Sequence, residues 1–106
     1  MTITLPPPIQ QFFASTNRGD TAGFLATFTP DASLTDWGRH FHGHDGIAAW
    51  NETDNIGVQS HLEATEVKQD GHRYVVTVQV AGKGFNGTGR MTFELKNDLI
   101  LRLVID

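Results

Sequence analysis

The C-terminal half of this chain alternates apolar and polar residues, and this pattern restricts the possible folds more than any other feature. An apolar residue at every second position is typical of a strand with one buried face. The pattern predicts three strands, at residues 73–81, 85–95 and 99–106. A weaker alternation at 58–68 precedes Asp70-Gly71, a dipeptide that favours a tight hairpin turn. The second half of the chain is therefore expected to form an antiparallel sheet.

The N-terminal part of the chain has the period of helices instead. Apolar residues are spaced by three or four positions over 9–16 and again over 21–28. Pro30 disfavours a helical conformation at Thr29, so the second helix is expected to end there. A third helix is expected near 47–57. Helices early and strands late favour an α+β domain whose helices cover one face of a bent sheet, and such a sheet can enclose an apolar cavity.

Composition limits the class of protein. The chain has 106 residues, a length expected for a single domain over residues 1–106. It has no apolar run long enough to span a membrane and no secretory signal, so we expect a cytoplasmic protein that binds no membrane. The formal net charge of −4, without a basic run, argues against nucleic-acid binding. The absence of cysteine excludes a thiolate nucleophile and cysteine-ligated zinc.

Several segments resemble a known superfamily. Residues 12–20, 24–28 and 30–32, followed by Leu34-Thr35-Asp36-Trp37-Gly38 and 43–50, are similar to the NTF2-like superfamily. This superfamily includes the SnoaL-like polyketide cyclases and the ketosteroid isomerases. The resemblance covers nearly the whole chain. It implies a cystatin/NTF2-like cone, with N-terminal helices packed on a strongly bent antiparallel sheet around an internal pocket, and it implies a homodimer.

Asp36 is the principal candidate for a catalytic residue. In the resemblance to ketosteroid isomerases it falls where those enzymes keep their carboxylate base. Phe12 and Met91 correspond to the tyrosine and the protonated aspartic acid that donate to the enolate oxygen, so both donors would be missing here. Such donors each contribute roughly 3–4 kcal/mol of transition-state stabilisation. Ketosteroid isomerase activity is therefore not predicted. A carboxylate beside Trp37 in an apolar cavity could still move protons, and the alternative is an aspartate that caps the turn before Gly38.

Two histidines complete the predicted catalytic set. His61 lies where many SnoaL-like proteins carry a histidine on the first long strand, and it is predicted either to help the aspartate or to be a sheet histidine with satisfied hydrogen bonds. His40 is the other predicted helper. Together with His42 and His44, it would place three potential metal ligands on one side of a strand. Gly43 is expected to break that strand, so we predict no metal site.

Aromatic residues are expected to build both the core and the pocket wall. Their number favours a small hydrophobic, ring-containing ligand. The sequence Gly82-Lys83-Gly84-Phe85-Asn86-Gly87 fits a dinucleotide-binding motif, but a strand rather than a helix is expected after it, so no cofactor is predicted. The predicted ligand-binding residues are Phe12, Phe28, Trp37, Trp50, Met91 and Phe93.

Two functions remain open from the sequence. The first is a pocket enzyme of SnoaL-like type that transfers a proton next to a carbonyl, as an isomerase, cyclase or dehydratase does. The second is a non-catalytic module of the same fold that binds an apolar ligand or only dimerises. Its dimer contact would be the mixed sheet face formed by Asn86, Thr88, Arg90, Thr92 and Glu94.

Overall fold

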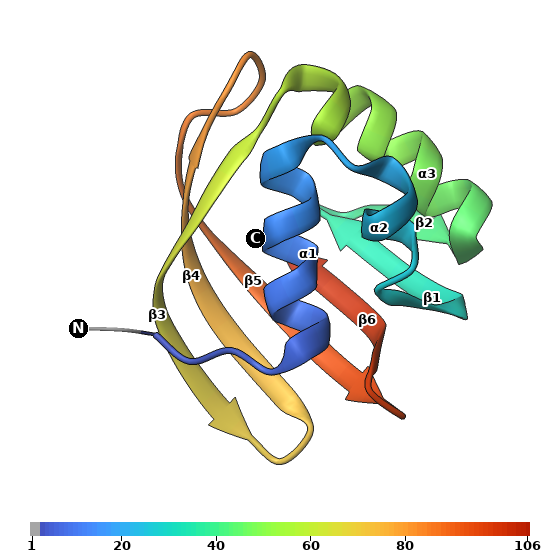
Figure 1. The fold of residues 1–106 in the computed structure, drawn as a ribbon, viewed down its shortest axis with the longest axis vertical. Coiled ribbons are helices and arrows are strands. Elements are labelled where there is room, and N and C mark those ends of the chain that lie inside the picture. The colour runs from blue at the N-terminus through green and yellow to red at the C-terminus, as the bar shows by residue number, and fades with distance from the viewer. Residues whose placement is uncertain (1–2) are drawn as a thin grey trace.

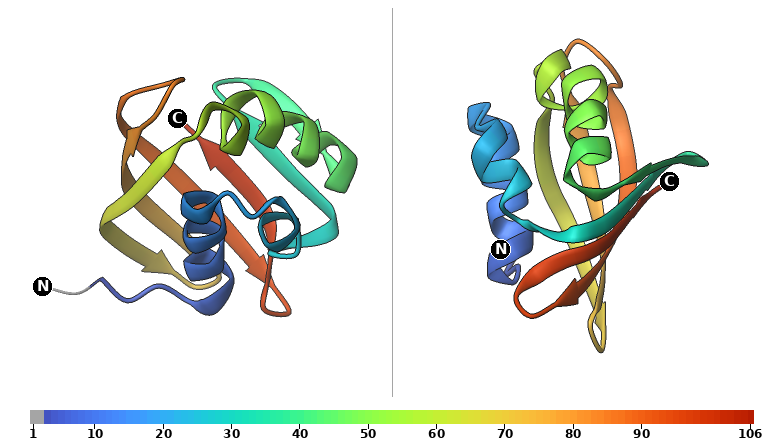
Figure 2. Two further views of the ribbon diagram at one scale, coloured as in Figure 1. Left: turned by 45° about the horizontal axis from the view of Figure 1, so that its top comes forward. Right: turned by 90° about the vertical axis from the view of Figure 1, so that its right-hand side faces the viewer.

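The computed structural model describes residues 3–106, which form helices packed on a single curved sheet. Figures 1 and 2 show all three α-helices on one face of this sheet, which confirms the predicted α+β architecture. None of the described helices is long and apolar enough to cross a membrane. In chain order the elements are α1 (Pro7–Arg18), α2 (Thr21–Leu25), β1 (Phe28–Asp36), β2 (Arg39–His42), α3 (Gly43–Asp54), the 3-10 helix η1 (Ile56–Val58), β3 (His61–Asp70), β4 (Arg73–Ala81), β5 (Gly87–Lys96) and β6 (Leu99–Ile105).

The strands follow the order β2-β1-β6-β5-β4-β3 across the sheet. Strands β3 to β6 form an antiparallel meander, and β2 returns antiparallel to β1. Strands β1 and β6 pair in parallel, so the sheet is mixed rather than wholly antiparallel. A hairpin forces consecutive strands to reverse, whereas the long connection between β1 and β6 permits a parallel pair. This pairing places Asp36, the last residue of β1, beside Ile105.

The second helix is shorter than predicted. It ends at Leu25 rather than at Thr29, and Phe28 already begins β1. Pro30 lies inside this strand, where the register against β6 shifts between Phe28 and Ser33. A proline lacks the N–H that a regular ladder needs, and it is tolerated where the pairing is irregular. Pro30 therefore does interrupt regular structure, but it marks irregular pairing within β1 and not the end of a helix.

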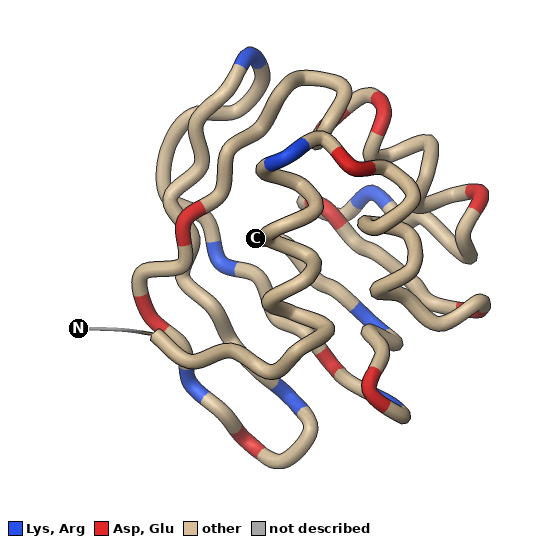
Figure 3. The backbone as a smooth tube through the Cα atoms, in the orientation of Figure 1, with Lys and Arg blue, Asp and Glu red and all other residues tan. Residues whose placement is uncertain are grey.

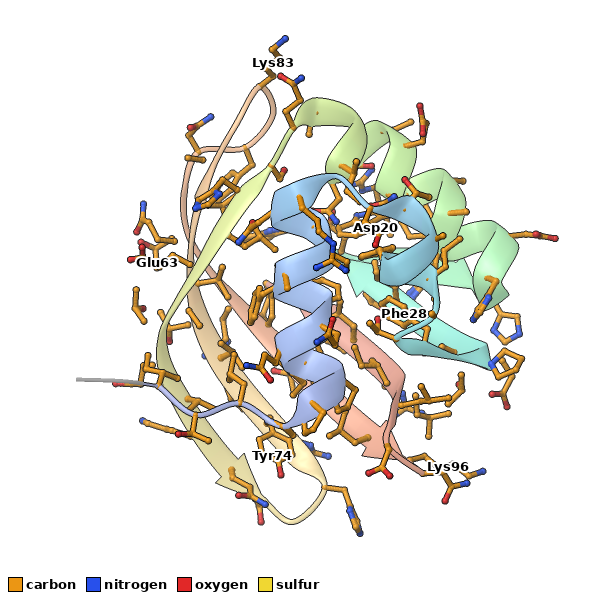
Figure 4. The ribbon with its side chains drawn as sticks, in the orientation of Figure 1. Asp20, Phe28, Glu63, Tyr74, Lys83 and Lys96 are labelled. Carbon is orange, nitrogen blue, oxygen red and sulfur yellow. The ribbon has the colours of Figure 1, made fainter. Side chains whose placement is uncertain are left out.

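A cluster of aromatic rings joins the helices to the sheet. The ring centroid of Phe12 lies 5.3 Å from that of Phe24, 6.0 Å from Phe28 and 5.2 Å from Phe93. Phe12 and Phe93 are completely buried. Phe28 extends this cluster from the start of β1, beside α2 (Figure 4). One continuous core therefore fixes α1 and α2 against β1 and β5.

The side chain of Asn17 attaches the end of α1 to β3. Its Nδ2 donates to the carbonyl oxygen of Leu62 at 2.9 Å, and the backbone N–H of Leu62 donates to its Oδ1 at 2.7 Å. β3 is an edge strand, so no neighbouring strand satisfies these two backbone groups. The contact is made where β3 turns Leu62 into the core and leaves His61 and Glu63 exposed.

A close approach at Gly57 in η1 leads to a stability prediction. A Cβ atom at this position would overlap the backbone carbonyl oxygen of Glu52. Gly57→Ala is therefore expected to lower the free energy of unfolding by about 1–3 kcal/mol, the usual cost of overpacking. The matched control is Gly89→Ala, because a Cβ there meets nothing within 4 Å and the change restricts the unfolded chain. Urea denaturation tests both variants, and equal stability of Gly57→Ala and the wild type would contradict the prediction.

Candidate functional site

A cavity of about 230 Å³ lies between the C-terminal part of α3, η1 and the inner face of the sheet. An engineered cavity of about 150 Å³ holds benzene, so this space is large enough for one substituted ring or a small fused pair. The wall is mainly apolar. Four neighbouring strands contribute one apolar side chain each to its floor, namely Leu62, Val80, Met91 and Ile105.

Asp36 brings a carboxylate to the wall of this cavity. Its Oδ2 accepts two hydrogen bonds, from the indole Nε1 of Trp50 at 2.9 Å and from Nη2 of Arg39 at 2.7 Å. The residue is only 9% exposed. The other oxygen, Oδ1, receives no hydrogen bond from residues 3–106, although the residue lines the cavity. The carboxylate is therefore held through one oxygen, and its second oxygen has no hydrogen-bond partner among residues 3–106.

Arg39 links Asp36 to a second carboxylate at the end of α3. Its guanidinium donates to Asp54 through Nη2 at 3.1 Å and Nη1 at 3.4 Å. The hydrogen bond with Asp54 is the main cause of a raised pKa for Arg39. Burial acts to raise the pKa of Asp54, but hydrogen bonds from Thr53 and Arg39 and the positive charge of Arg39 outweigh burial and lower it. The three charged groups thus form one cluster at the cavity. Elsewhere, acidic and basic residues are distributed over the whole chain (Figure 3).

The lowered pKa of Asp54 gives a prediction for acid stability. Because the carboxyl binds a proton less readily in the folded state, it stabilises the fold above about pH 4, the ordinary aspartate range, and this contribution is lost as pH falls through the folded-state pKa. The difference in melting temperature between the wild type and Asp54→Asn should therefore shrink as pH is lowered from 7 to below 3. Asp45→Asn, on the exposed side of the same helix, is the control. A difference that stays constant with pH would contradict the assignment.

Two largely exposed aromatic side chains stand at the opening of the cavity. Trp37 is 72% exposed and Phe85 is 57% exposed, and both contribute to the lining. Trp37 occupies the turn between β1 and β2 with a φ of 50°, in the left-handed region that a bulky residue rarely adopts. Such backbone strain is often found at functional positions.

Phe85 was predicted to begin a strand, but in the structure it lies in a loop. β5 begins at Gly87, and the amide of Asn86 organises the preceding loop by donating to the carbonyl oxygens of Gly82 at 2.8 Å and Gly84 at 3.1 Å. The N–H of Lys83, at the tip of the loop in Figure 4, donates to the carbonyl oxygen of Val58 at 2.8 Å. These contacts attach the loop to η1 and set Phe85 at the opening of the cavity. The glycine-rich motif therefore serves a loop between strands.

The structure brings only part of the predicted site together. Asp36, Trp37, Trp50 and Met91 line the cavity. His61 is exposed at the start of β3, and exposed His40 makes a 3.0 Å hydrogen bond between its Nδ1 and Thr35 Oγ1. Neither histidine lines the cavity. Their catalytic roles stay predictions. Phe12, Phe28 and Phe93 are core residues outside the lining.

The histidines in and beside β2 do not form a cluster of metal ligands. The Nε2 atom of His44 lies 3.0 Å from the carbonyl oxygen of Phe28, which ties the start of α3 to β1. β2 ends at His42 and α3 begins at Gly43, as expected for a strand break at this glycine. Within residues 3–106 no group of three or more histidine, cysteine, aspartate or glutamate side chains is arranged to hold a metal ion.

Several cavity residues were missed by sequence reasoning. Arg39 and Asp54 are fifteen positions apart and meet only because α3 packs over β2. Ser60 and Asn55 are almost completely buried polar residues of the lining. Asn55 falls at the end of the predicted third helix and Ser60 in the weakly alternating stretch after it, and neither pattern marks them as site residues. The one available signal was Trp50, whose indole N–H needs a partner when buried and finds it in Asp36.

Comparison with known proteins places these features in a family. No curated protein matches the chain. A solved protein from Sinorhizobium meliloti, provisionally named a polyketide cyclase, is 29% identical over 96% of this chain and 95% of its own, with a TM-score of 0.89. A provisionally named ketosteroid isomerase from Kribbella flavida is 17% identical over 94% of this chain and 74% of its own, with a TM-score of 0.80.

A third similar structure is a computationally designed 17-OHP binder, 16% identical over 93% of this chain and 86% of its own, with a TM-score of 0.79. At this identity, as for the ketosteroid isomerase, the likeness concerns the fold. The SnoaL-like domain family matches residues 9–103, which is most of the chain and includes Asp36 and the core strands. The chain therefore belongs to the SnoaL-like family of the NTF2-like superfamily.

Proposed function

We propose that the cavity binds a small, mainly apolar ring compound with a carbonyl group, and that Asp36 takes a proton from a carbon next to that carbonyl. The observation that carries this proposal is the Asp36 carboxylate, which is almost buried in the lining of the cavity, is held through Oδ2 and accepts no hydrogen bond at Oδ1 from residues 3–106. A general base needs both a fixed position and an accessible lone pair.

The chemistry is a reversible proton transfer. The carboxylate accepts the proton, the electron pair of the C–H bond becomes the double bond of an enolate, and negative charge moves to the carbonyl oxygen. Return of the proton to the same carbon regenerates the ketone, and return to another carbon gives an isomer. The step needs no redox partner, and the apolar floor keeps the skeleton of the ligand out of water.

The relatives agree with this proposal in two respects. The name of the Sinorhizobium meliloti protein refers to polyketide cyclisation, which acts on carbonyl compounds. The designed 17-OHP binder has the same fold and binds a small molecule. The cavity of this chain is modest in size, so we expect one or two rings in the enclosed part of its ligand.

Deuterium exchange tests both halves of the proposal. 2-Tetralone, a two-ring ketone, is incubated in D₂O with the protein, and loss of its proton signals next to the carbonyl is followed by NMR. Binding is followed by tryptophan fluorescence, since both tryptophans of the chain line the cavity. We expect saturable binding and exchange faster than in buffer alone. Binding without faster exchange would contradict the catalytic half, and absence of binding would contradict the whole proposal.

The alternative is a non-catalytic ligand-binding or dimerisation module. It is favoured by the lack of donors at the two positions that correspond to the ketosteroid isomerase donors, because Phe12 is in the core and Met91 offers only a thioether to the cavity. A homodimer through the β5 face stays a prediction of either function, and sedimentation at micromolar concentration tests it. The exchange measurement separates the two functions.

A further inference from the structure

Ser60 carries a second polar group that lacks a partner in the cavity. The residue is 7% exposed and contributes to the lining. Its Oγ makes no hydrogen bond with residues 3–106. Within this part of the chain, the only side-chain polar atom that has no accessible surface and no hydrogen bond is Nδ2 of Asn51. The Oγ of Ser60 therefore keeps some accessible surface, and because the residue lines the cavity we infer that the hydroxyl faces it. A hydroxyl donor in a largely desolvated wall costs free energy unless a ligand or a water molecule accepts its hydrogen bond.

The backbone around Ser60 is held firmly. Gln59 has a φ of 55°, in the left-handed region, and its N–H donates to the carbonyl oxygen of Ile56 at 2.8 Å. The N–H of Ser60 donates to the carbonyl oxygen of Asn55 at 3.0 Å. Gly82 packs so closely that a Cβ there would lie 2.8 Å from the Gln59 oxygen and 3.0 Å from Ser60 Cα. This strained, tightly packed turn fixes the backbone from which the hydroxyl projects.

Ser60 and Asp36 reach the cavity at the ends of two strands that are not neighbours in the sheet. Asp36 ends β1, whereas Ser60 directly precedes β3, and β6, β5 and β4 lie between these two strands. The apolar floor residues Ile105, Met91 and Val80 come from those intervening strands. The lining thus has an acceptor at the end of β1, a hydroxyl before the start of β3 and apolar side chains from the three strands between them.

We propose that Ser60 donates a hydrogen bond to an acceptor oxygen at the end of the ligand remote from Asp36. This inference rests on the proposed function and narrows its ligand class to ring compounds that are polar at both ends. In a conjugated ligand, the remote oxygen would also receive the negative charge that proton loss creates, and the Ser60 hydroxyl would stabilise it there. Ser60 is then a specificity-determining residue, distinct from the base.

A pair of ligands isolates this contact. 2-Tetralone and 6-methoxy-2-tetralone share one skeleton and one carbonyl, but only the second has an acceptor oxygen on the far ring. Their affinities are measured by tryptophan fluorescence for the wild type, Ser60→Ala and the control Ser33→Ala, whose residue lies on β1 outside the cavity lining. We expect the methoxy compound to bind the wild type more tightly, by roughly three- to tenfold for one neutral hydrogen bond.

In Ser60→Ala this advantage should disappear, because the affinity for the methoxy compound falls while that for 2-tetralone is unchanged. Ser33→Ala should preserve the advantage. Equal weakening of both ligands in Ser60→Ala, or no methoxy advantage in the wild type, would overturn the inference while leaving the proposed function intact. Failure of both ligands to bind the wild type would overturn the proposed function and this inference with it.

Discussion

Replacing Asp36 with Asn is expected to slow the protein-catalysed deuterium exchange of 2-tetralone by a factor of about 10² to 10⁴, the usual contribution of a positioned general base. The amide has nearly the same shape as the carboxylate, and its single oxygen can still accept from Trp50 and Arg39. Its nitrogen then takes the place of the free Oδ1 and cannot accept a proton. The variant should therefore lose the reaction and keep the cavity.

The Asp36→Asn measurement needs a binding control and a matched acid. Affinity for 2-tetralone, read from tryptophan fluorescence, should change much less than the exchange rate. Asp31→Asn removes an exposed carboxylate from the same strand, outside the cavity lining, and should exchange like the wild type. An Asp36→Asn variant that binds the ketone and keeps the wild-type exchange rate would exclude Asp36 as the base.

Replacing Phe12 with Ala is expected to lower the free energy of unfolding by about 3–5 kcal/mol. The ring is completely buried and lies against those of Phe13, Phe24, Phe28 and Phe93, with the shortest centroid distance 5.2 Å. Its removal loses the apolar transfer energy and opens a hole that this rigid cluster cannot close. A domain has only about 5–15 kcal/mol of stability in total, so the variant should be close to unfolding at moderate temperature.

Phe85→Ala is the matched control for the Phe12 prediction. The same ring is removed from a side chain that is 57% exposed, and the expected cost is below about 1 kcal/mol. Urea denaturation measures both. The milder variant Phe12→Leu should fold and bind 2-tetralone like the wild type, because Phe12 does not line the cavity. Equal costs for the two alanine variants would show that the aromatic cluster is not the main support of the fold.

Periodicity was sufficient to predict the fold class, because the alternation of Tyr74, Val76 and Val78 and the helical spacing of Ile9 and Phe12 reflect which face is buried. Periodicity did not predict which distant strands pair with each other. Nothing local in β1 or β6 shows that the two run parallel, since this depends on the path of the intervening chain. A turn between Asp36 and Gly38 was also expected, and β1 does end at Asp36 before such a turn.

The site was predicted less well, because it depends on which way neighbouring residues point. His61 and Ser60 are adjacent, yet one is exposed and the other nearly buried, and a shift of one residue in register would exchange them. The hydroxyl of Ser60 also has no sequence signal of its own. Phe12 and Phe93 were assigned to the pocket because core and pocket wall use the same residue types, and only packing distinguishes them.

The contact between Asn17 and Leu62 also bears on self-association. An exposed strand edge can recruit a strand from another molecule and start a fibril. At the beginning of β3 the amide of Asn17 occupies the two backbone groups of Leu62 that an incoming strand would use. Further along, β3 carries Glu63, Glu66 and Lys68, whose charges oppose stacking. One asparagine on a helix thus leaves an incoming strand no free backbone group at Leu62, at the edge next to the cavity.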